Sequence, residues 1–70
     1  MTAADITTAR KTVDTVSTLI AGIADTLVNK GAQKDRATTV ATDHVLSKMA
    51  TERPAAFGAY TRSLAVLDLA

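Results

Sequence analysis

The sequence predicts an all-α fold, either a small three-helix bundle or a bent helical hairpin. Gly31 and Pro54 divide the 70 residues into three segments of helical length. Apolar residues in the first segment recur in steps of three and four, the period of a helix that packs along one face. No segment alternates apolar and polar residues as a half-buried strand would. We therefore expect helices over about residues 3–30, 35–51 and 54–69, within a single domain that spans residues 1–70.

The first predicted helix has clear signals at both ends. Thr2 and Asp5 have the spacing of a capping box, in which a hydroxyl and a carboxylate accept hydrogen bonds from backbone amides at a helix start. Lys30 and Gly31 fit a helix stop, with a cation in the last turn and a glycine that can adopt the left-handed conformation. Between these ends runs an apolar seam that consists of Ile6, Ala9, Val13, Val16, Ile20, Ile23 and Leu27. Six threonines between residues 7 and 26 lower the helix propensity, so packing along the seam must stabilise this helix.

The second and third helices are predicted from their boundaries more than from their apolar stripes. Asp35 is the expected N-cap of the second helix. That helix should end near Ala50 or Thr51, because Arg53 precedes a proline and is biased toward extended geometry. Pro54 suits the first turn of the third helix. One face of the third helix carries Phe57, Tyr60, Leu64 and Leu67.

The predicted lengths leave two architectures open. At 1.5 Å per residue the first helix is about 40 Å long and each later helix about 24 Å. One short helix would cover only part of the seam, whereas two placed end to end would cover all of it. The chain therefore closes a compact three-helix bundle, or it folds the two later helices into a bent arm along the first. We favour a bundle completed by self-association, because a core of this size rarely contributes more than about 3–5 kcal/mol.

The composition excludes several kinds of site. The chain has no cysteine and a single histidine, His44, so we expect no disulfide, no metal site and no cofactor. The net charge is +1, which gives no field to attract nucleic acid or an anionic membrane. No nucleophile or acidic residue lies at a spacing from His44 that would indicate a catalytic site, and no serine lies in a glycine-flanked nucleophile elbow. We expect no catalytic residue and no small-molecule ligand, and a half-buried or interfacial role for His44.

One local concentration of charge lies between the first two helices. Lys30, Lys34 and Arg36 surround the predicted start of the second helix, where backbone amides and cations together can hold an anion. The glycine-rich P-loop pattern is absent. A solvated connecting loop is the simpler interpretation, and the three residues are retained as a candidate anion site.

Protein association is the function that the sequence favours. Apolar residues outside the main stripes form a candidate outer interface: Leu19, Val28, Leu46, Val66 and Leu69. We expect a non-enzymatic interaction or structural assembly module, most simply a homo-oligomer. The alternative is a small regulator that binds and blocks a protein or, with less support, a nucleic acid. The chain shows no secretion signal and no membrane span, so we expect it in the cytoplasm or within a larger assembly. A composition rich in threonine and alanine would suit a phage or virion component.

Overall fold

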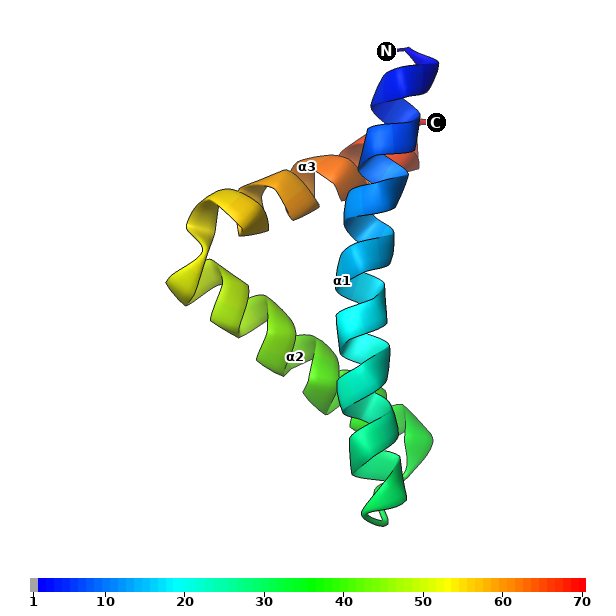
Figure 1. Ribbon diagram of the computed structural model, residues 1–70, viewed down its shortest axis with the longest axis vertical. Helices are drawn as coiled ribbons and strands as arrows, with labels where there is room; N and C mark the ends of the chain where they lie inside the picture. Colours follow the sequence, from blue (N-terminus) through cyan, green and yellow to red (C-terminus); the bar gives the residue numbers. More distant parts are fainter. Residues whose placement is uncertain (1) are drawn as a thin grey trace.

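The protein consists of three α-helices that pack against one another, as seen in a computed structural model that describes residues 2–70. The helices are α1 (Ala3–Asn29), α2 (Lys34–Glu52) and α3 (Pro54–Leu69) (Figure 1). The predicted all-α fold is therefore confirmed. The predicted boundaries agree with the observed ones to within one or two residues, the usual uncertainty at helix ends.

Both ends of α1 have the predicted geometry. The Thr2 hydroxyl accepts a hydrogen bond from the Asp5 amide at 3.2 Å, and the Asp5 carboxylate accepts one from the Thr2 amide at 2.9 Å. At the other end Gly31 adopts a φ of 106°, which favours glycine. The Ala32 amide then donates to the Leu27 carbonyl and the Gly31 amide to the Val28 carbonyl. This pair of bonds is the Schellman motif, and it turns the chain directly back toward α1.

The predicted N-cap of α2 was wrong. Gln33, with φ −67° and ψ 144°, is the N-cap, and its side chain makes no capping hydrogen bond. The Ala37 amide donates to the Gln33 carbonyl at 2.8 Å, so the helix starts one residue earlier than expected. Asp35 lies inside the first turn, where its carboxylate still interacts favourably with the helix dipole.

A single residue, Arg53, separates α2 from α3. Its non-helical conformation (φ −138°, ψ 65°) ends α2 and begins α3 at the same point, with Pro54 in the first turn of α3. The proline ring restricts the residue before it, which explains why the break falls at this position. The Arg53 amide donates to the Met49 carbonyl, and its carbonyl accepts from the Phe57 amide. We call this one-residue connection the elbow.

The three helices form a flat triangle (Figure 1). α2 begins beside the C-terminal end of α1 and diverges from it, and α3 returns from the elbow to cross the N-terminal half of α1. The helices are about 40, 28 and 24 Å long at 1.5 Å per residue. Because the two shorter helices together exceed the length of α1, their shared elbow must stand away from it. All three helices contact one another, which is consistent with the predicted small three-helix bundle, and α2 and α3 form an angled arm across α1.

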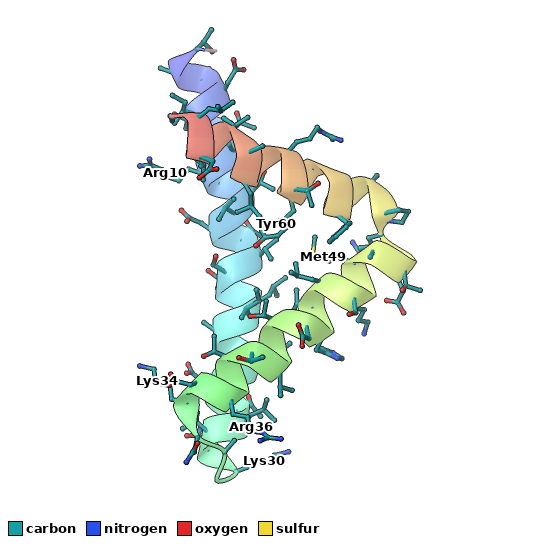
Figure 2. All side chains as sticks on the ribbon, turned by 180° about the vertical axis from the view of Figure 1, so that it is seen from behind. Arg10, Lys30, Lys34, Arg36, Met49 and Tyr60 are labelled. Carbon is teal, nitrogen blue, oxygen red and sulfur yellow. The ribbon has the colours of Figure 1, made fainter. Side chains whose placement is uncertain are left out.

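The core is small and consists of small side chains. Ala24, Ala37 and Ala41 form its central cluster between α1 and α2, and part of the seam packs against them. The only buried residue of α3 is Ser63, whose hydroxyl donates to the Ala59 carbonyl at 2.8 Å. Across residues 2–70 no large side chain is fully buried. The shortest dimension of the molecule is 15 Å. Figures 1 and 2 show the start of α2 and the end of α3 crossing the same side of α1, so α1 forms one layer and the arm made of α2 and α3 forms the other.

Candidate functional site

A concavity of about 690 Å³ lies inside the triangle, between the middle of α1, the second half of α2 and the start of α3. We refer to it as the concavity. Its apolar lining consists of Val16, Leu19, Val45, Met49, Ala56 and Ala59. Its polar lining consists of Thr12, Thr15, His44, Lys48, Glu52 and Arg53. Figure 2 shows Met49 of α2 and Tyr60 of α3 pointing toward the interior of the triangle. The length mismatch between α1 and the bent arm therefore creates a hollow that is largely apolar.

A second hollow continues from the concavity along α1. This α1 groove has a volume of about 450 Å³ and is lined by Thr18, Leu19, Gly22, Ile23, Thr26 and Leu27. Leu19 lines both hollows and is 55% exposed, so it forms a ridge between them. We call the concavity, the α1 groove and the Leu19 ridge together the Leu19 face. It combines a protruding apolar side chain with two apolar depressions beside it.

The threonine hydroxyls of the Leu19 face already donate hydrogen bonds within α1. Each hydroxyl donates to the backbone carbonyl four residues earlier in α1. The bonds run from Thr12 to Thr8 (3.1 Å), Thr15 to Lys11 (2.9 Å), Thr18 to Asp14 (2.9 Å) and Thr26 to Gly22 (3.1 Å). A partner that covers this face would leave none of these donors unsatisfied, so the usual cost of burying hydroxyl groups is largely avoided.

Gly22 has open space where a side chain would stand. A Cβ atom added at this position would meet nothing within 4 Å, and the residue has ordinary helical geometry. Glycine inside a helix costs about 1 kcal/mol relative to alanine. Gly22 lies in the α1 groove, one turn from Thr18 and one turn from Thr26. Because it has no side chain, the helix surface is lower at this point. A close approach from outside the chain would use that space.

The predicted seam serves mainly as the internal contact of α1. Val16 is buried, and the other large residues of the seam are half-buried: Ile6, Val13, Ile20, Ile23 and Leu27. In the candidate outer interface Leu19, Val28 and Leu69 are exposed, whereas Leu46 and Val66 are half-buried. Of these five residues, only Leu19 lines the concavity and the α1 groove. The sequence interpretation missed Gly22, Met49, Ala56 and Ala59, and only the Thr18-Gly22-Thr26 spacing beside Leu19 gave a signal for any of them.

The basic residues near the α1–α2 turn do not all converge. Lys30 and Arg36 extend to one side of the turn, and Lys34 extends to the other (Figure 2). Lys34 is the first residue of α2, and no side chain caps that helix start. The three residues therefore remain only a candidate anion site.

His44 lies on the polar rim of the concavity and is exposed. Of the two positions expected for it, the half-buried one is therefore not observed, and the interfacial one stays a prediction. Within the described part of the chain no group of three or more histidine, cysteine or acidic residues is placed to hold a metal ion. Among residues 2–70 no helix has the length and apolar character needed to cross a membrane.

Comparison with family models, with curated proteins and with solved structures finds no match to this chain.

Proposed function

We propose that this chain is a non-enzymatic protein–protein interaction or structural assembly module that acts through its Leu19 face. The observation that carries the proposal is the Leu19 ridge itself. A leucine side chain that is 55% exposed stands between two apolar hollows on one side of the molecule. Contact of this kind, an apolar side chain seated in an apolar depression, is how helices pack against one another.

The polar groups of the face are arranged to support such a contact. The threonine hydroxyls are bonded within α1, and the charged residues of the concavity, Lys48, Glu52 and Arg53, belong to the end of α2 and the elbow. Protein interfaces commonly have this organisation, with an apolar centre and charged residues at the rim. The cysteine-free composition rich in threonine and alanine suits a part of a particle such as a virion.

Site-specific photocrosslinking in the source cell tests the proposal. A photoreactive amino acid replaces Leu19 in one variant and Ala21, an exposed residue on a different side of α1, in a matched variant. We expect a defined protein adduct from position 19 and none of comparable yield from position 21. Equal yields at both positions, or no protein adduct at position 19, would contradict a function based on the Leu19 face.

The same experiment separates an assembly component from a small regulator that binds and blocks another protein. An assembly component gives adducts between copies of this chain or with a fixed structural neighbour. A regulator gives an adduct with a protein whose activity falls when this chain is added, and replacement of Leu19 by glutamine should remove that inhibition.

A further inference from the structure

The open triangular arrangement of the helices exposes more surface than a monomer of this mass normally does. The chain has a mass of 7.3 kDa and exposes 5105 Å². A typical globular monomer of that mass exposes about 4,200 Å², so the excess is about 900 Å². The radius of gyration shows the same expansion, 13.5 Å against about 11 Å expected for 70 residues. The excess is close to the roughly 800 Å² that each partner contributes to a standard protein interface.

The packing of α2 and α3 against α1 leaves the Leu19 face uncovered. Domains normally enclose their core between packed layers of secondary structure. Here the contacts among the three helices bury only small residues and leave the concavity and the α1 groove open. A partner seated on the Leu19 face would bury the half-buried seam residues that line it.

The Leu19 face is complementary to itself. It carries a ridge and two depressions side by side, so a twofold axis next to the ridge would place Leu19 of each copy in a depression of the other. Because Gly22 has no side chain, the backbones of two α1 helices can approach closely at this position. A net charge of +1 per chain gives two copies no appreciable repulsion.

We infer that a second copy of this chain covers the Leu19 face, and that the two copies form a symmetric dimer with each Leu19 seated in the other copy's hollows. The inference rests on the proposed function, and it names the partner that the function requires. It also assigns Gly22 a role, as the point of close approach between the two α1 helices.

Sedimentation equilibrium of the full chain tests the inference directly. We expect a reversible monomer–dimer equilibrium at protein concentrations up to about 1 mM. Replacement of Leu19 by glutamine should raise the dissociation constant by about 100-fold, since each buried leucine contributes about tenfold and the symmetric dimer contains two. The matched control is Leu69→Gln, which removes a leucine that is 78% exposed but lies outside both hollows. This control should leave the dissociation constant unchanged.

A second pair of variants separates dimerisation from folding. Gly22→Gln adds a bulky side chain where the chain itself has no neighbour within 4 Å, so helicity should be preserved or raised. It should abolish the dimer by blocking the approach of the second α1. Ala21→Gln makes the same addition at the adjacent exposed position, which lines neither hollow, and should leave dimerisation intact.

The outcomes distinguish this inference from the proposed function. A wild-type chain that stays monomeric up to about 1 mM overturns the dimer. So does a dimer that is insensitive to both Leu19→Gln and Gly22→Gln, because that dimer would use another surface. In either case photocrosslinking from position 19 to a different protein would still support the proposed function, whereas the absence of any adduct there would overturn both.

Discussion

The two ends of the triangle differ in how closely their helices approach α1. At the α1–α2 turn, a Schellman motif reverses the chain within a few residues and brings Ala37 and Ala41 against Ala24. Toward the elbow, α2 diverges from α1 and the concavity opens between them, lined by the buried Val45 and the half-buried Met49. We call these regions the closed end and the open end.

Side-chain size and helix length together explain this difference. Alanine side chains let two helix backbones approach closely, and a tight turn holds them in that position. At the open end no tight turn holds α2 and α3 against α1. A single residue joins α2 to α3 there, and the two helices together are longer than α1. The closed end therefore holds the tightest contact between two helices, and the open end provides the surface available for association.

The largest expected effect is that of a charge at the centre of α1. Val16 is only 5% exposed and borders the concavity, so Val16→Asp would bury an unpaired carboxylate. The cost, several kcal/mol, is comparable with the whole stability of a chain this small, about 3–5 kcal/mol. We expect loss of helical circular dichroism at 25 °C. Val40→Asp, at a valine that is 48% exposed, should remain folded. A folded Val16→Asp protein that merely dissociates would show that Val16 is an interface residue.

The next largest effect tests the packing of the closed end. Ala41 is completely buried, and Ala41→Leu should destabilise the fold by about 1–3 kcal/mol because the two helices have no room to separate. Ala50→Leu, at an exposed position of the same helix, should change stability by less than about 0.5 kcal/mol. Urea denaturation at low protein concentration measures both. A neutral Ala41→Leu variant would mean that the closed end is as loosely packed as the open end.

Glycine-to-alanine substitutions should have opposite signs at the two ends. Gly31→Ala forces a side chain into a conformation with φ of 106° and should destabilise the protein by about 1–2 kcal/mol. Gly58→Ala, in α3, places a Cβ 3.2 Å from the end of the flexible Arg62 side chain and should stabilise the helix by up to about 1 kcal/mol. Thermal denaturation of both variants gives the signs. Equal signs would indicate that the turn at Gly31 does not fix the closed end.

The smallest expected effect is at the N-terminus of α1, which projects beyond α3 (Figure 1). Thr2→Ala removes half of the capping box and should cost about 0.5–1 kcal/mol. Because this segment lies beyond the packed part of α1, the loss should appear as faster amide hydrogen exchange at Asp5 and Ile6, with the closed end unchanged. Thr8→Ala, which leaves the cap in place, should not accelerate exchange at these amides. Uniform acceleration throughout α1 in Thr2→Ala would contradict this local effect.

The sequence by itself determined the number of helices and nearly all of their boundaries. The Thr2–Asp5 capping box, Gly31 and the Arg53–Pro54 pair act through backbone conformations and hydrogen bonds within a few residues of each signal. Such local features can be read without knowledge of the rest of the chain. The N-cap of α2 was missed because Gln33 fills that position by backbone geometry alone, with no side-chain bond to mark it.

The tertiary structure alone decided which flank of α1 stays open. Val16 and Leu19 are three residues apart on the same helix, yet one is buried and the other is 55% exposed. The apolar period already separated these two residues, since it placed Val16 in the seam and Leu19 in the candidate outer interface. The period did not indicate which residues of α2 and α3 would lie near Leu19, because that depends on the directions in which those helices leave and return to α1. Leu46 and Val66, expected at the outer surface, are half-buried for the same reason, while Met49, Ala56 and Ala59 line the concavity. The physical cause is the mismatch between one long helix and two shorter ones joined by a single residue, a property of the assembled chain.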